Sequence, residues 1–231
     1  VLSLLALSFG ASVEVSCMVS KEKRSYQPSM AQYAPHKTQS LGSVLSSTAS
    51  DFTNVVSGWS HTCALTADGS AKCWGDNDYG QLGDGTRTDR STPVEVSGLN
   101  GAVTALAAGR WHTCALMADK SVKCWGDNHN GMLGDGTFAS SKTPVGVIGL
   151  DNDVTMIDAG WNHTCALTAA GCVKCWGYNS FGQLGDSTTL DRNTAVSVVG
   201  LTSGITALAV GGDHTCALTA DGLAKCWGDN D

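Results

Sequence analysis

The sequence is poor in proline, aromatic residues and charge: of 231 residues, 4 are proline, 6% are aromatic and 15% are charged. No apolar run approaches the roughly 18 residues that a membrane-spanning helix needs, which argues against such a helix. Basic residues number 14 against 21 acidic ones, giving a net charge of −7, so a nucleic-acid partner held through its phosphates is not expected. Apolar residues, at 42%, and glycine, with 28, are abundant. This composition indicates a globular protein with many tight turns between short strands.

The first 51 residues differ in kind from the rest. Val1–Ala11 is an apolar run as long as the core of a signal peptide, although an initiator methionine and a basic start are missing. We therefore expect residues 1–17 to be a signal peptide or anchor region that is truncated at its start. Cys17 stands where a lipoprotein carries its acylated cysteine, but Glu14 departs from that motif, so lipidation is an alternative only. Residues 18–51 are rich in Ser and Thr and are expected to form a flexible tether.

A repeat of 51 residues governs the chain from Phe52 onward. It places one histidine, two cysteines and one tryptophan at a constant step, without gaps. The members are His61, His112, His163 and His214; Cys63, Cys114, Cys165 and Cys216; Cys73, Cys124, Cys175 and Cys226; and Trp74, Trp125, Trp176 and Trp227. Within the repeat region, 52–231, we expect copies over 52–102, 103–153 and 154–204, with a partial copy over 205–231.

Each copy contains four short β-like segments and no helical periodicity. In the second copy these segments are Val103–Ala108, His112–Met117, Ser121–Trp125 and Pro144–Ile148. A period in this range with four strands per copy is typical of propeller blades. The sequence therefore predicts an all-β protein, a β-propeller of four-stranded blades.

The blade sequence also resembles a known repeat. His61 to Gly85 contains H-T-C-A-L-T-A-D-G followed by K-C-W-G-D-N-D-Y-G-Q-L-G-D-G, and the run W-G-x-N-x-x-G-Q-L-G recurs at Trp176–Gly185, with Met132 replacing Gln in the second copy. Over residues 52–231 this pattern resembles the repeat of the regulator of chromosome condensation family. The resemblance implies a ring of seven blades. We therefore expect an incomplete ring of about three and a half blades, cut at both ends.

The two cysteines of each copy flank a short turn such as Ala67-Asp68-Gly69. A three-residue hairpin loop with glycine in the left-handed position would place Cys63 opposite Cys73, whereas a two-residue loop would place it opposite Trp74. The first register predicts four disulfides: Cys63–Cys73, Cys114–Cys124, Cys165–Cys175 and Cys216–Cys226. Lys120 departs from the glycine rule. Disulfides indicate an oxidising compartment, so a secreted or cell-surface protein is expected, and buried free thiols in a reducing cell are the alternative.

One further cysteine pattern, Cys172-Val-Lys-Cys175, resembles a zinc or redox motif. Two residues three apart on one predicted strand point to opposite faces, and no second pair completes a tetrahedral site. Cys172 is therefore expected to be an odd thiol.

Two other patterns resemble metal sites. The repeated histidines would lie too far apart in a ring to share an ion, and each is expected to bond locally at a strand start. Asp76-Asn77-Asp78 with Asp84-Gly85 resembles a calcium loop only loosely, because Gly80 stands where a third ligand is expected. From Phe52 on, 17 of the 18 acidic residues are aspartate, which favours turns. Turn chemistry is therefore preferred over calcium binding, and neither a metal nor a cofactor is predicted.

Binding is expected at positions that vary between copies. After each strand-ending glycine come Trp59-Ser60, Arg110-Trp111, Trp161-Asn162 and Gly212-Asp213. We expect Trp59, Arg110, Trp111 and Trp161 to lie near one face as a binding patch, since Trp and Arg are enriched at binding hot spots. The alternative is that each Trp packs on the neighbouring blade. A second variable set covers residues 87–91, 138–142 and 189–193.

No unique Ser/His/Asp set, no carboxylate pair outside the repeats and no phosphate-binding glycine loop is found, so catalytic residues and enzyme activity are not predicted. The leading hypothesis is a non-enzymatic binding scaffold outside the cytoplasm that recognises a protein or glycan through one propeller face. Membrane contact is expected only through the N-terminal anchor. The family resemblance adds an inhibitor or regulator, as in a secreted propeller that inhibits beta-lactamases, and a guanine-nucleotide exchange factor for a small GTPase. The exchange role fits poorly, because those family members carry an inserted hairpin that this gap-free repeat lacks.

Overall fold

A computed structural model describes residues 52–150 and 152–230. The expected leader with Cys17 and the expected tether lie outside these residues. Every regular element of the described part is a β-strand, and none of it forms a helix long and apolar enough to cross a membrane. The strands are β1 (Phe52–Ser57), β2 (His61–Thr66), β3 (Ala71–Gly75), β4 (Arg90–Glu95), β5 (Val103–Ala108), β6 (His112–Met117), β7 (Val122–Gly126), β8 (Ser141–Gly146), β9 (Val154–Ala159), β10 (His163–Thr168), β11 (Val173–Gly177), β12 (Arg192–Ser197), β13 (Ile205–Val210), β14 (His214–Thr219) and β15 (Ala224–Gly228).

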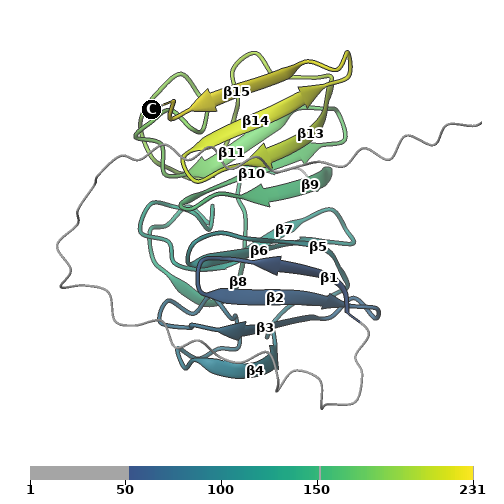
Figure 1. Ribbon diagram of the computed structural model, residues 1–231, viewed down its shortest axis with the longest axis vertical. Helices are drawn as coiled ribbons and strands as arrows, with labels where there is room; N and C mark the ends of the chain where they lie inside the picture. The colour runs from purple at the N-terminus through teal and green to yellow at the C-terminus, as the bar shows by residue number, and fades with distance from the viewer. Residues whose placement is uncertain (1–51, 151, 231) are drawn as a thin grey trace, which may run out of the picture. The chain divides into compact units, whose positions relative to one another are not determined.

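The strands form successive antiparallel sheets, one per repeat, in the orders β1-β2-β3-β4, β5-β6-β7-β8, β9-β10-β11-β12 and β13-β14-β15. We call these sheets blades 1 to 4. Figure 1 shows them following one another, from blade 1 at the bottom to blade 4 at the top. The first strands β1, β5, β9 and β13 are neighbours from blade to blade. The predicted all-β architecture of four-stranded propeller blades is therefore confirmed.

Two strands of blade 2 have other bounds than the sequence predicts. The third strand of blade 2 begins at Val122 and not at Ser121, because Ser121 donates its backbone N–H and its hydroxyl to Asp119 and so belongs to the turn. The fourth strand covers Ser141–Gly146 and not Pro144–Ile148, since Ile148 N–H already donates to Gly134 O in the preceding loop.

The hairpin between the second and third strands takes the register that brings the cysteines together. In blade 1, Thr66 N–H donates to Ser70 O at 2.9 Å and Gly69 has φ = +82°. Four disulfides follow, each with a Cα–Cα distance of 4.1 Å: Cys63–Cys73, Cys114–Cys124, Cys165–Cys175 and Cys216–Cys226. Lys120 takes the place of the glycine in blade 2 and adopts the same left-handed conformation, with φ = +67°.

Cys172 lies in the turn just before β11, and not on the strand as predicted. Its thiol is free and donates to Thr202 O at 2.7 Å.

The core lies between adjacent blades. Trp125 of blade 2 is fully buried against apolar residues of blade 1, and its indole N–H donates to Gln81 O at 2.9 Å. The same bond joins Trp176 to Met132 O at 2.8 Å and Trp227 to Gln183 O at 2.9 Å. Gly83, at φ = +67°, lies on this ring so closely that a Cβ would be 2.7 Å from the indole nitrogen. The repeated Trp and Gly of the motif therefore join one blade to the next.

The repeated histidines also join blades, which corrects the expectation of a local bond. His61 Nε2 lies 2.8 Å from Thr113 Oγ1 of the next blade. His112 and His163 bond Thr164 and Thr215 in the same way, each at 2.9 Å. Because the Thr113 hydroxyl donates onward to Gln81 O at 2.9 Å, it accepts from the imidazole, which fixes the Nε2–H tautomer. The local histidine bond expected from the sequence is thus a bond between neighbouring repeats.

Candidate functional site

The connections between the first and second strands of the blades lie at one end of the sheets. They are Gly58–Ser60, Gly109–Trp111, Gly160–Asn162 and Gly211–Asp213. In each blade the glycine N–H donates to the carbonyl of the following histidine at 2.9 Å, which closes a tight turn. No side chain fits at the glycine, since a Cβ at Gly109 would lie 2.1 Å from His112 Cε1. The two residues after the glycine are therefore held at fixed places while their side chains are free to vary.

The first of these two positions lines a pocket. Trp59, Arg110, Trp161 and Gly212 occupy it in blades 1 to 4, around a cavity of about 280 Å³. Backbone bonds from Arg110 N–H to Trp161 O, at 3.0 Å, and from Trp161 N–H to Gly212 O, at 3.1 Å, link these connections across blades. Trp59 and Trp161 are 49% and 47% exposed, so the packing alternative describes each ring only in part.

Aromatic and cationic side chains continue from this pocket across the end of the sheets. The Trp59 and Trp161 rings meet edge to face with their centroids 6.2 Å apart. Arg110 Cζ lies 5.2 Å from the centroid of the Trp59 ring and 4.0 Å from that of the Trp111 ring. We call Trp161, Trp59, Arg110, Trp111, Tyr79 and His129 the aromatic array. It unites the four predicted patch residues and adds two more.

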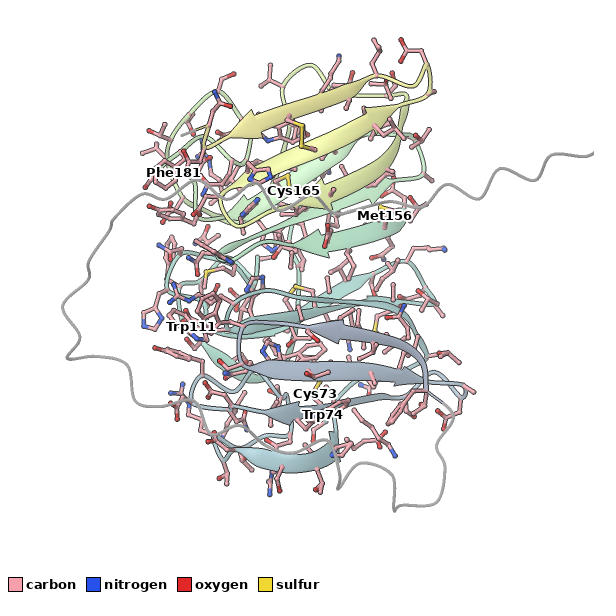
Figure 2. All side chains as sticks on the ribbon, viewed as in Figure 1. Cys73, Trp74, Trp111, Met156, Cys165 and Phe181 are labelled. Carbon is pink, nitrogen blue, oxygen red and sulfur yellow. A yellow bond between two sulfur atoms is a disulfide. The ribbon has the colours of Figure 1, made fainter. Side chains whose placement is uncertain are left out.

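The two added residues were missed by the sequence analysis. The Tyr79 and Trp111 rings are stacked with their centroids 5.1 Å apart, and the His129 ring lies nearly perpendicular to Tyr79 with a centroid separation of 6.0 Å. Both lie in the loops between the third and fourth strands, at positions that vary within the repeat. Variability within an otherwise constant loop was the signal that could have identified them. Figure 2 labels Trp111 and Phe181, the blade 3 residue that corresponds to Tyr79, at the same end of the sheets.

These loops are held by a fully buried asparagine. Asn77 Nδ2 donates to the Asp84 carboxylate and to Thr88 O, while its Oδ1 accepts from Leu82 N–H at 3.0 Å. Asn128 and Asn179 make the same bonds in blades 2 and 3. Burial raises the pKa of Asp84, but hydrogen bonds from Thr86, Arg90 and Asn77 outweigh it and hold that pKa below the usual value. The aspartates of the motif therefore act as turn residues here.

Carboxylates gather around the aromatic array. Burial, and after it the nearby Asp229, raises the pKa of Asp213, while Arg110 favours its charged form. Oxygen atoms of Asp76, Asp78 and Asp89 lie within 4.8 Å of one another, and the charge of Asp76 raises the pKa of Asp78. Such a group could hold a cation, yet the corresponding residues of blade 3 are Tyr178, Ser180 and Asp191, so it is no feature of the repeat.

The pocket offers no group for acid–base chemistry. Its described lining residues include no His, Cys, Asp or Glu. Burial lowers the pKa of His61 to about 4, that of His112 to about 3 and that of His163 to about 4, so these imidazoles are neutral near pH 7. The arrangement is suited to contact through ring faces and not to proton transfer.

Sequence comparison identifies the repeat. Two family profiles, both described as regulator of chromosome condensation (RCC1) repeat, match the chain. One matches residues 68–116 and 121–167, and the other residues 52–81, 103–131, 154–183 and 205–231.

Similar proteins include longer chains of several kinds. The ultraviolet-B receptor UVR8 of Arabidopsis thaliana is 34% identical over 177 residues, which are 75% of this chain and 40% of the receptor. The human E3 ubiquitin-protein ligase HERC2 is 33% identical over 183 residues, or 77% of this chain and 4% of the ligase. The chain thus spans less than half the length of these relatives.

Solved structures agree on the fold. Yeast RCC1 (Prp20), in its complex with Kap60, superposes with a TM-score of 0.71 at 22% identity, over 80% of this chain and 45% of that one. Human WBSCR16 gives a TM-score of 0.69 at 24% identity, over 78% and 48%. With the same repeat matched in each of its blades, the chain belongs to the regulator of chromosome condensation (RCC1) repeat family.

Proposed function

We propose that this protein is a non-enzymatic scaffold that binds a protein ligand through the end of the blades that carries the aromatic array. The observation that supports this best is the convergence of Trp59, Arg110 and Trp161, from three blades, around one pocket whose indole rings stay half exposed. Tryptophan and arginine contribute most at protein interfaces when they lie at the centre of a rigid surface. Yeast RCC1 was solved in complex with Kap60, an instance of a protein with this fold that binds another protein.

We also propose an extracytoplasmic location. Four disulfides, one in each described blade, support it, because reducing compartments keep thiols free. Export of a tagged full chain, followed by thiol labelling with and without reductant, tests this directly. Labelling of more than Cys17 and Cys172 before reduction would contradict it.

The binding proposal is tested by affinity capture with the full chain and a Trp59→Ala/Trp111→Ala/Trp161→Ala variant. A matched control is Ile148→Ala/Val199→Ala/Leu223→Ala, which removes three exposed apolar side chains from the opposite end of the blades. We expect partners that are captured by the wild type and the control but not by the tryptophan variant. An identical set of partners from all three folded proteins rejects the patch. Binding to a glycan array in place of a protein would reassign the ligand class.

A second candidate function, ultraviolet reception, is proposed on one observation. The relative from Arabidopsis thaliana is named as an ultraviolet-B receptor, and indole, the strongest near-ultraviolet absorber among side chains, occurs here in contact with a guanidinium at 4.0 Å. The test is ultraviolet-B irradiation of the purified chain, with tryptophan fluorescence, molecular mass and partner capture measured before and after. No reversible change in any of them rejects this candidate.

A further inference from the structure

We infer that the partner of the aromatic array is a basic protein segment, whose arginine or lysine side chains meet the exposed indoles and the aspartates around them. This inference rests on the proposed function and adds the chemistry of the ligand.

The first observation is the charge at this end of the blades. The connections that carry the array, between first and second strands and between third and fourth strands, contain nine aspartates and two basic residues, Arg87 and Arg110, within the described ranges. Asp84 and Asp186 are paired with Arg90 and Arg192, at 2.8 and 2.7 Å. Seven aspartates remain against Arg87, Arg110 and, at the start of β8, Lys142, so the end is acidic.

The opposite end of the same blades is balanced. Its described connections hold Asp68, Asp119, Asp153 and Asp221 against Lys120. The strand ends there add Glu95, opposite Lys72, and a lysine as the second residue of every third strand: Lys72, Lys123, Lys174 and Lys225. The net negative charge of the described chain is therefore concentrated around the aromatic array. A surface potential of one sign attracts and orients a partner of the other sign.

The second observation is the placement of acids beside the array. Asp78 immediately precedes Tyr79, which stacks on Trp111, and Asp76 lies two residues earlier. Asp78 and Asp89 are exposed. The repulsion that raises the pKa of Asp78 is relieved when a cation approaches. Asp213 lies close enough to Arg110 to be influenced by its charge.

Arg110 does not oppose this polarity. Its guanidinium is stacked between Trp59 and Trp111, and its Nε is buried. The half-exposed Trp59 and Trp161 still offer ring area to an incoming cation, and indole is the ring that cations bind best. Basic side chains thus find both aspartate and indole partners at the same end.

The test uses two fluorescent peptides of equal length, one rich in arginine and lysine and one in which glutamate replaces each basic residue, with anisotropy as the measurement. In the Asp76→Asn/Asp78→Asn/Asp89→Asn variant, amide oxygens replace the carboxylate oxygens of Asp76 and Asp89 that accept from Asp78 N–H and Asn77 N–H. Its matched control, Asp68→Asn/Asp119→Asn/Asp221→Asn, makes the same charge change at the opposite end.

We expect the basic peptide alone to bind, about tenfold more weakly at 200 than at 50 mM salt. The first variant and Trp59→Ala/Trp161→Ala should each weaken binding by about threefold or more, and the control should not. Equal binding to every variant, preference for the acidic peptide, or no binding of the basic peptide overturns the inference. If capture of natural partners still depends on the tryptophans in that case, the proposed scaffold function stands and only the charge of its ligand is wrong.

Discussion

At the scale of single residues, the buried histidines make the stability of the fold sensitive to pH. His61, His112 and His163 are buried between blades, and the Nδ1 atom of each lacks a hydrogen-bond partner. A second proton on such a ring has no acceptor and no solvent, which is why burial lowers the pKa values to about 4, 3 and 4.

Stability is therefore expected to fall in mild acid. Each histidine titrates near 6.5 when unfolded and well below that when folded, so the unfolded state takes up protons first. The free energy of unfolding should be constant above about pH 7, decline from about pH 6.5 and level off below about pH 3, losing on the order of 3 kcal/mol per histidine. Urea unfolding at pH 7, 5.5 and 4.5 measures this decline. An unchanged unfolding midpoint across that range would mean that the imidazoles are solvated.

A second residue-scale prediction concerns Gly109. Adding a methyl group there would bring a Cβ to within 2.1 Å of His112 Cε1 and 2.6 Å of Gly160 O. We expect Gly109→Ala to destabilise the protein by about 2–3 kcal/mol through overpacking. Gly146→Ala is the control, because a Cβ there would meet nothing within 4 Å and the φ of Gly146 is not positive. Equal melting temperatures for the two variants would disprove the steric account.

At the scale of the strand pair, two kinds of bond join the second and third strands of each blade: the antiparallel backbone hydrogen bonds and the disulfide. The turn sets the register and the register brings the sulfurs together, as Lys120 shows by adopting the glycine conformation in blade 2.

Removing one bridge should therefore weaken a blade without changing its pairing. For Cys114→Ser/Cys124→Ser we expect a loss of about 2–3 kcal/mol in the free energy of unfolding. Cys172→Ser, which removes the described free thiol, should be neutral within about 0.5 kcal/mol. Denaturant titration of both variants decides, and a neutral double variant would show that the ladder alone holds the hairpin.

The hairpins were predictable because their information is local. The constant spacing of the cysteines and the turn residues between them determine the register, and the strands follow from the same repeat. Contacts between blades were not predictable in this way. His61 meets Thr113, Trp125 meets Gln81 O and Tyr79 meets Trp111 only once neighbouring sheets are packed together. Trp59, Arg110, Trp111 and Trp161 were predicted as a patch from their variability, whereas the contacts of Arg110 with Trp59 and Trp111 depend on how the blades are placed.

At the scale of the whole molecule, each described blade forms the same hydrogen bonds with its neighbours. A histidine and a carbonyl on one side meet a threonine and an indole on the other, at 2.8–2.9 Å for the histidines. Stability in such an array is a sum of units and of the interfaces between them.

A deletion of one full period should therefore fold. Removing residues 103–153 would place His61 opposite Thr164 and Gln81 O opposite Trp176. These pairs repeat the bonds that already join blade 2 to blade 3, where His112 meets Thr164 and Trp176 meets Met132 O. We expect a β-rich circular dichroism spectrum, three disulfides and cooperative unfolding. Removal of residues 103–140, which is not a full period, should abolish cooperative unfolding. If both deletions behave alike, the interfaces are not interchangeable.

The connection between the first and second strands of blade 2 departs from this repetition. In blade 2 Arg110 stands first in its connection and an aromatic residue second, whereas in blades 1 and 3 Trp59 and Trp161 come first and a polar residue follows. A row of identical indoles would be degenerate, because a ligand could attach one blade further along with equal affinity. For the ligand proposed above, Arg110 and Trp111 would remove that ambiguity, since only one alignment meets tryptophan, arginine and tryptophan in that order. A chain made of repeats would thereby offer its proposed ligand a single binding position.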